Sequence, residues 1–257
     1  LEVDTENDEN DGSVTDGDIS LRDAISAIAS GGTITFADSI ADQTITLDET
    51  LGELLINTGL IIDGDLDDDG SPDITVERDS NANNDFRIFN IDDNDNGSAI
   101  AVTLEGLTIT GGSVTGDGGG IFNREDLTLS NSTVSGNSAD VRGGGIYNDG
   151  TANLTNSTVS GNSADFGGGI FNSYYGTANL TGSTVSGNSA DYGGGISNDG
   201  TATLTNSTVS GNSATGNFSN GGGIYNNGTA NLTNSTVSGN SAEDEGGGIF
   251  NDDGGDD

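Results

Sequence analysis

Residues 131–155 read Asn-Ser-Thr-Val-Ser-Gly-Asn-Ser-Ala-Asp-Val-Arg-Gly-Gly-Gly-Ile-Tyr-Asn-Asp-Gly-Thr-Ala-Asn-Leu-Thr, and at Asn156 the same phrase begins again. Its first nine residues recur at 206–214 and 234–242, and at 182–190 with Gly182 in place of the first Asn. Glycine triplets begin at residues 118, 143, 167, 193, 221 and 246, so successive triplets lie 25, 24, 26, 28 and 25 residues apart. A period of this length is typical of the coils of a solenoid.

Each repeat contains three short segments that the sequence predicts to be strands, such as 145–147, 152–155 and 158–160. One apolar residue recurs in each kind of segment. The three rows are Ile121, Ile146, Ile170, Ile196, Ile224 and Ile249; Leu129, Leu154, Leu180, Leu204 and Leu232; and Val134, Val159, Val185, Val209 and Val237. Three inward rows imply three faces built of parallel strands. The sequence therefore predicts an all-β fold, a single-stranded parallel β-helix with about 25 residues per coil.

Asparagine also recurs, and stacked asparagines are expected to form hydrogen-bonded ladders at the bends of the coils. One candidate row consists of Asn137, Asn162, Asn188, Asn212 and Asn240, and another of Asn123, Asn148, Asn172, Asn198, Asn226 and Asn251. The glycine triplets are expected where only glycine tolerates the backbone conformation or where neighbouring coils approach closely. The repeated positions are thus explained as scaffold.

The chain divides into four parts by composition. Residues 1–19 form an acidic, polar lead-in with almost nothing to bury, which we expect to be loose or ordered by cations. Residues 20–32 are predicted to be a capping helix, because Leu21, Ile25 and Ile28 fall on one helical face and Ser20 can cap its start. Residues 33–112 are predicted to be irregular coils with acidic loops, and residues 113–257 regular coils of the same β-helix. The start at Leu1 suggests a mature or excerpted region of a longer protein.

Composition excludes most catalytic chemistry. The chain has no Cys and no His, and all five of its basic residues are arginines, so a disulfide, a thiolate metal site, a Ser-His-Asp triad and a Schiff-base lysine are excluded. The net charge of −37 argues against nucleic acid as a partner. No apolar run approaches the ~18 residues of a membrane-spanning helix, so no membrane insertion is expected. The acidity indicates either a solvated surface that resists aggregation or binding of multivalent cations.

Residues 1–110 hold 27 of the 42 acidic residues, so a cation site is sought there first. Asp65, Asp67, Asp69 and Asp73 occupy positions 1, 3, 5 and 9 of an EF-hand-like loop, with Gly70 at the sharp turn. Position 12 is Val76, so the segment is closer to the shorter, helix-free calcium loops. Calcium is predicted here, and the alternative is an acidic turn that binds nothing in particular. A weaker second loop contains Asp92, Asn94 and Asn96.

The Gly-Gly-Gly-Ile-Tyr-Asn and Asn-Ser-Thr-Val-Ser-Gly-Asn-Ser-Ala phrases follow Ser20-Leu21-Arg22-Asp23-Ala24-Ile25 and Ile61-Ile62-Asp63-Gly64. Together they resemble the bacterial right-handed parallel β-helix surface proteins. These include polymorphic outer-membrane-protein-like repeats and large repetitive extracellular proteins of cyanobacteria and other environmental bacteria. The resemblance covers nearly all of residues 18–251 and implies a right-handed helix, in agreement with the usual hand of parallel crossovers. Such modules occur in adhesins, autotransporter passengers, surface fibres and some polysaccharide lyases.

The leading hypothesis is a non-catalytic extracellular or cell-surface structural protein, either a stalk or adhesin or a self-assembling fibre subunit, stabilised by calcium. Its expected partners are a second copy stacked end to end or the continuation of a longer chain, and a surface polysaccharide. One alternative is a polysaccharide-binding or polysaccharide-cleaving β-helix, for which the repeats offer Arg124 and Arg142, and aromatic residues such as Tyr147 that either stack on sugars or shield the sheet. Another is ice binding by the rows of Thr-Val-Ser.

Overall fold

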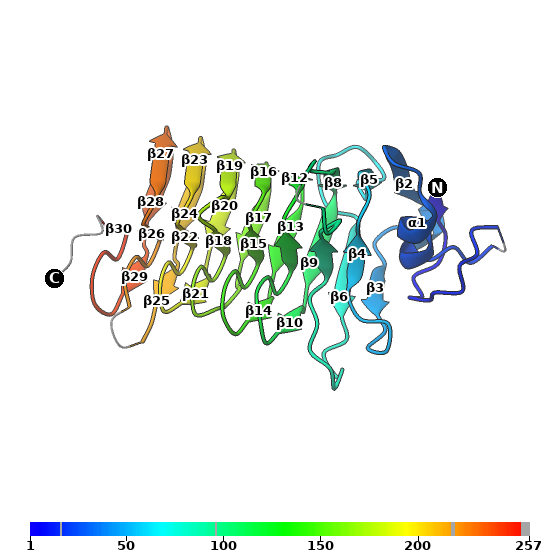
Figure 1. Cartoon of the computed structure of the whole chain (residues 1–257), viewed down its shortest axis with the longest axis horizontal. Helices are drawn as coiled ribbons and strands as arrows, with labels where there is room; N and C mark the ends of the chain where they lie inside the picture. The colour runs from blue at the N-terminus through cyan, green and yellow to red at the C-terminus, as the bar shows by residue number, and fades with distance from the viewer. Residues whose placement is uncertain (16, 96, 217–218, 253–257) are drawn as a thin grey trace.

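The chain forms a parallel β-helix of three long sheets, seen side-on in the computed structural model (Figure 1), which describes residues 1–15, 17–95, 97–216 and 219–252. We name each sheet after the apolar residue that recurs in it. The Leu sheet has nine strands, in spatial order β1 (Glu2–Val3), β2 (Gly32–Phe36), β5 (Leu60–Asp63), β8 (Ala101–Glu105), β12 (Asp126–Ser130), β16 (Thr151–Thr155), β19 (Thr177–Thr181), β23 (Thr201–Thr205) and β27 (Thr229–Thr233).

The other two long sheets have eight strands each. The Ile sheet comprises β4 (Leu54–Ile56), β7 (Phe89–Ile91), β11 (Ile121–Asn123), β15 (Ile146–Asn148), β18 (Ile170–Asn172), β22 (Ile196–Asn198), β26 (Ile224–Asn226) and β30 (Ile249–Asn251). The Val sheet comprises β3 (Thr44–Leu47), β6 (Ile74–Arg78), β9 (Leu107–Thr110), β13 (Thr133–Ser135), β17 (Thr158–Ser160), β20 (Thr184–Ser186), β24 (Thr208–Ser210) and β28 (Thr236–Ser238).

Smaller elements complete the coils. One short sheet pairs β10 (Ser113–Val114) with β14 (Ser138–Ala139), and another contains β21 (Ser189–Ala190), β25 (Ser213–Ala214) and β29 (Ser241–Ala242). The helical elements among the described residues are α1 (Leu21–Ala27) and the 3-10 turn η1 (Asp38–Ile40). No helix in the described ranges has the length and hydropathy needed to cross a membrane.

Register follows the sequence repeat, as the spacing predicts. Ile121 pairs with Ile146, Leu129 with Leu154 and Val134 with Val159 across adjacent coils, and every strand pairing in the three sheets is parallel. The three rows are buried to within about 1% exposure from Ile121 to Ile224, so they form one continuous core along the axis. The predicted parallel β-helix of three faces is therefore confirmed, and its hand is right-handed.

The glycine triplets mark the closest approach between coils. Gly143 has a positive φ of 66°, which favours glycine. At Gly144 a Cβ would overlap the carbonyl oxygens of Ser163 and Gly168 in the next coil, so no side chain fits there. The triplet is therefore required both by local conformation and by stacking.

The capping helix is shorter than the sequence predicts. It spans Leu21–Ala27 instead of 20–32, with Ser20 as the N-cap, whose side chain accepts from the backbone N–H of Asp23. Gly31, near the end of the predicted range, has φ 79° and lies in the turn that leads into β2. The apolar face packs on the first coil and closes one end of the stack (Figure 1).

Residues 1–19 are attached to the first coil, although few of their described residues are buried. Val3 is fully buried, because β1 extends the Leu sheet by pairing in parallel with β2. Arg22 on α1 binds both carboxylate oxygens of Asp8 at 2.8 Å and also donates to the carbonyls of Gly52 and Glu53. The lead-in is thus attached to the first coil by a strand and a buried ion pair.

Candidate functional site

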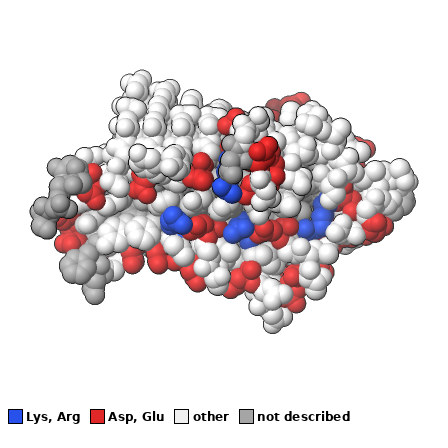
Figure 2. Space-filling view, in the orientation of Figure 1, with Lys and Arg blue, Asp and Glu red and all other residues white. Residues whose placement is uncertain are grey.

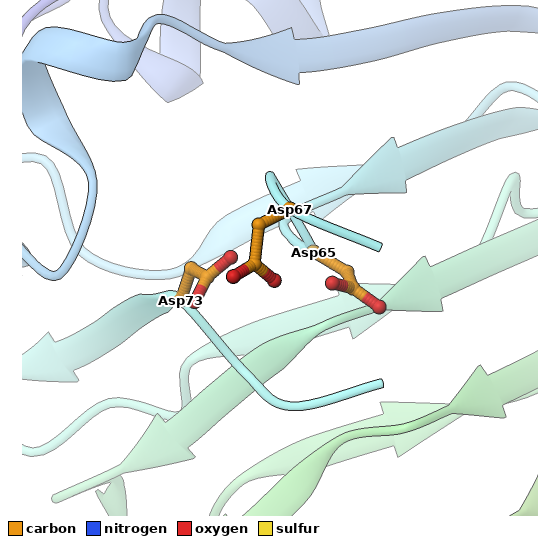
Figure 3. Close-up of side chains that lie close together, drawn as sticks. All are labelled: Asp65, Asp67 and Asp73. Atoms are coloured by element: carbon orange, nitrogen blue, oxygen red, sulfur yellow. The ribbon is translucent and has the colours of Figure 1, made fainter. Parts of the chain in front are cut away.

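The acidic loop after β5 gathers three of the four predicted calcium ligands. Carboxylate oxygens of Asp65, Asp67 and Asp73 lie within 4.8 Å of one another, and Figure 3 shows the three side chains facing a common space. The loop is shaped by its own backbone, since Asp65 accepts the N–H groups of Asp69 and Gly70 at 3.1 and 3.0 Å. Asp73 accepts the N–H of Leu66 at 2.7 Å, which joins the two ends of the loop.

Asp69 is not part of this cluster. Its carboxylate accepts the N–H of Ser71 at 2.8 Å, an aspartate turn that directs it to the loop's own backbone. Asp68 and Gly70 on either side have positive φ values of 57° and 82°. Of the four aspartates that the sequence spacing predicts as ligands, Asp65, Asp67 and Asp73 therefore lie together and Asp69 does not.

Glu105 is an acidic neighbour that the sequence reasoning missed. It lies on β8, in register with Asp63 on β5, although 42 residues separate the two in sequence. Burial raises the pKa of the Glu105 carboxyl, and the charges of Asp63, Asp65 and Asp68 raise it further. The coil register alone brings Glu105 to the loop, so no local motif could have indicated it.

The weaker second loop also contains a group of neighbouring carboxylates. The carboxylates that lie together there are those of Asp92, Asp93 and Glu125, of which Asp92 belongs to the predicted set. Asn96 lies outside the described residues. Glu125 is almost fully buried, accepts the N–H groups of Asp93 and Ile100, and has a pKa raised chiefly by burial.

An arginine side chain forms an ion pair with this second cluster. Arg124 donates to Asp92 at 3.2 Å and also lies 3.8 Å from Asp149. Its guanidinium partly neutralises the second cluster. None of the ion pairs in the described residues includes Asp65, Asp67 or Asp73. The first loop is therefore the better candidate for a metal ion.

Both asparagine rows form continuous side-chain ladders. Along the first row the Nδ2 of each residue donates to the Oδ1 of the next, at 3.1, 3.0, 2.9 and 3.0 Å from Asn137 to Asn240. The same Nδ2 groups also donate to main-chain carbonyls, as Asn162 does to Val134. The second row continues in the same way from Asn123 to Asn251. These amides hold coils together and are not available to a ligand.

Aromatic rings form a second kind of row on the outer face of the Ile sheet. Phe122 stacks on Tyr147 at 4.9 Å between ring centroids, and Tyr147 stacks on Phe171 at 5.6 Å. The guanidinium of Arg142 lies 5.3 Å from the rings of both Tyr147 and Phe171. It also forms two hydrogen bonds with Asp117, so it is ion-paired. Figure 2 shows the positive side chains in one band along the molecule, with carboxylates beside them.

The Val sheet presents a regular row of hydroxyls. Its central apolar residue points inward, and the flanking residues of each strand point outward. The in-register row is longer than the repeats alone indicate and contains Thr44, Thr75, Thr108, Thr133, Thr158, Thr184, Thr208 and Thr236. Eight threonines from eight successive coils therefore lie along one face.

Comparison with known proteins supports a surface β-helix. Residues 131–149 and 234–252 match the Chlamydia polymorphic membrane protein repeat. Both segments begin with the Asn-Ser-Thr-Val-Ser-Gly-Asn-Ser-Ala phrase on which the resemblance to β-helix surface proteins rests. No curated protein matches the chain.

A solved structure, the crystal structure of pectate lyase Pel9A, is similar with a TM-score of 0.60 and 15% sequence identity. The alignment covers 92% of this chain and 62% of the pectate lyase chain. At this identity the similarity shows the fold alone. The chain is a right-handed parallel β-helix in which two segments match the polymorphic membrane protein repeat, a combination that fits a surface protein.

Proposed function

We propose that the protein is a non-catalytic extracellular structural module, a rigid stalk or adhesin at the cell surface. The observation that carries this proposal is the uninterrupted register of three sheets, with eight or nine strands each, over one continuous core. A solenoid of this kind gains stability from each neighbouring coil and presents a long, regular surface. The repeat that matches the Chlamydia family supports a surface location.

The charged groups support a structural role over catalysis. Arg142 is paired with Asp117 and Arg124 with Asp92, so the two arginines considered for a lyase both neutralise carboxylates. A lyase needs a base that is free to take a proton. Incubation with acidic polysaccharides should give no unsaturated products. If the wild type forms such products and Arg142→Gln does not, the non-catalytic assignment is overturned.

Calcium is the proposed stabilising ion, bound by Asp65, Asp67 and Asp73. Three carboxylates converge with Glu105 close by, and hard oxygen ligands of this kind are those that Ca²⁺ prefers. A bound divalent ion would relieve the mutual repulsion of these charges. Mg²⁺ is expected to stabilise less, since it requires stricter octahedral geometry.

Thermal melting followed by circular dichroism tests the calcium site. At a calcium concentration about 100-fold above the dissociation constant, the native state gains about 2.7 kcal/mol, or roughly 5–10 °C in melting temperature for a chain of this size, relative to EDTA. The double variant Asp65→Asn with Asp73→Asn should lose this shift, whereas Asp126→Asn, on strand β12, should keep it. Equal melting temperatures of the wild type in calcium and in EDTA would refute the site.

The C-terminal coil offers a surface for association. Leu232 and Ile249 are 36% and 45% exposed, whereas their counterparts Leu204 and Ile224 one coil earlier are 1% exposed. We propose that this edge pairs with a further coil, supplied by a longer chain or a second copy. Because α1 covers the opposite end, copies meeting at the open edge should form pairs instead of filaments. Sedimentation of the 257-residue chain checks this: long filaments would contradict it.

Ice binding is retained as a second candidate because of the eight-threonine row on the Val sheet. A flat array of hydroxyls at strand spacing repeats about every 4.8 Å, which suits an ordered lattice of water. Thermal hysteresis is the direct assay. Activity that Thr158→Leu with Thr184→Leu abolishes would favour this function, and an absence of hysteresis at high protein concentration would exclude it.

A further inference from the structure

The aromatic row on the Ile sheet has one missing ring. Strand β22 places Ser197 between Phe171 of β18 and Tyr225 of β26, at the position where the neighbouring coils carry an aromatic residue. The backbones at Phe171 and Tyr225 are therefore two strand spacings apart, about 9.6 Å, with Ser197 in place of a ring between them. Tyr192, in the same coil, does not complete the stack, because its ring meets Tyr225 edge-on.

A groove of about 430 Å³ opens at this gap. Its lining combines aromatic and polar side chains, namely Arg142, Phe166, Phe171, Ser197, Asp199 and Tyr225. Phe166 is 36% exposed, so part of its ring is open to solvent. Aromatic surface with a few convergent polar groups is the usual make-up of a ligand pocket, and the volume is in the usual range.

Ser197 adds a hydroxyl to the lining of the groove. The residue is 1% exposed, yet its hydroxyl takes part in none of the hydrogen bonds found within residues 1–15, 17–95, 97–216 and 219–252. Its Oγ is not among the fully buried side-chain atoms without a partner in the described residues, so it is accessible from the groove, where a ligand hydroxyl could replace water.

The other polar groups define the class of ligand. Arg142 uses Nε and Nη2 for Asp117 and keeps Nη1 as a further donor, while the carboxylate of Asp199 is an acceptor. Donors, acceptors and aromatic faces together match a sugar, whose ring has hydroxyls at its edge and C–H groups on its face. The net charge of −37 and the nearby carboxylates disfavour an acidic sugar. We propose that this Ser197 groove binds a pyranose ring of a neutral polysaccharide.

Isothermal titration calorimetry with neutral hexasaccharides of glucose, mannose and N-acetylglucosamine tests the proposal, with hexagalacturonate as the acidic comparison. The wild type should bind at least one neutral hexasaccharide, and hexagalacturonate at least about tenfold more weakly. Ser197→Phe fills the gap with a residue type that the row already uses, and should weaken binding by about tenfold or more. Ser130→Phe, on the Leu sheet, is the matched control and should bind like the wild type.

Ser197→Ala removes only the hydroxyl and provides a second test if Ser197→Phe alters the circular dichroism spectrum. It should weaken binding about threefold to tenfold. The proposal is overturned if no neutral hexasaccharide binds the wild type, if hexagalacturonate binds more tightly, or if folded Ser197→Phe and Ser197→Ala bind like the wild type. It goes beyond the stalk function, and its failure would leave the calcium-dependent melting test unaffected.

Discussion

Replacing Asn162 by Ala tests how far the asparagine ladder holds the coils together. The side chain is 1% exposed and takes part in four hydrogen bonds. It accepts from the backbone N–H and the Nδ2 of Asn137 at 3.0 and 3.1 Å, and it donates to the carbonyl of Val134 and the Oδ1 of Asn188, both at 3.0 Å. At about 1 kcal/mol net for each bond, the loss is about 4 kcal/mol.

Part of this cost comes from the group left behind. The backbone N–H of Asn137 has no other acceptor among the described residues, so Asn162→Ala buries an unpaired donor in the adjacent coil. We therefore expect the free energy of unfolding to fall by about 3–5 kcal/mol. Urea denaturation measures this change. Amide hydrogen exchange should show the largest loss of protection at Asn137, because each coil contacts only its neighbours.

Asn156→Gly is the matched control within the same repeat phrase. Asn156 is exposed and has φ 50°, and the chain itself places Gly182 with φ 62° at the equivalent position of the next coil. The control should change stability by no more than about 0.5 kcal/mol. If Asn162→Ala costs less than about 1 kcal/mol, or no more than Asn156→Gly, the ladder does not stabilise the stack in the way its geometry indicates.

Three further predictions concern stability. Arg22→Met should cost about 3–5 kcal/mol in chemical denaturation, because it leaves the buried carboxylate of Asp8 without its partner; a cost below about 1 kcal/mol would contradict this. Gly144→Ala should cost more than Gly161→Ala, since a Cβ at Gly144 overlaps Ser163 whereas Gly161 has only its positive φ to overcome; equal melting temperatures would refute the close-packing argument. Burial and the acceptor Asp252 raise the pKa of Tyr225, so stability should fall as pH rises above the unfolded-state value of about 10, and Tyr225→Phe should reduce that slope; an unchanged slope would count against it.

The repeat made the regular half of the fold predictable. Because Ile121, Leu129 and Val134 recur every 24–28 residues, equivalent residues lie in adjacent coils, so the register and the core follow from the sequence. The asparagine rows follow for the same reason. The N-terminal helix was recognisable from its periodicity, but its end was not, because Gly31 is compatible both with a helix stop and with the turn into β2.

The tertiary structure decided which side chains meet across coils that do not repeat. Glu105 approaches the Asp65 loop, and Glu125 joins Asp92, only because parallel strands place residues many positions apart at the same point of successive coils. In the sequence, Ser197 is the one exception at the aromatic position of the Gly-Gly-Gly-Ile repeat. The groove beside it depends on the side chains that surround Ser197 in the folded chain. A repeat determines what lies above and below each residue, whereas the surroundings of an exceptional residue depend on loops whose path only the folded chain defines.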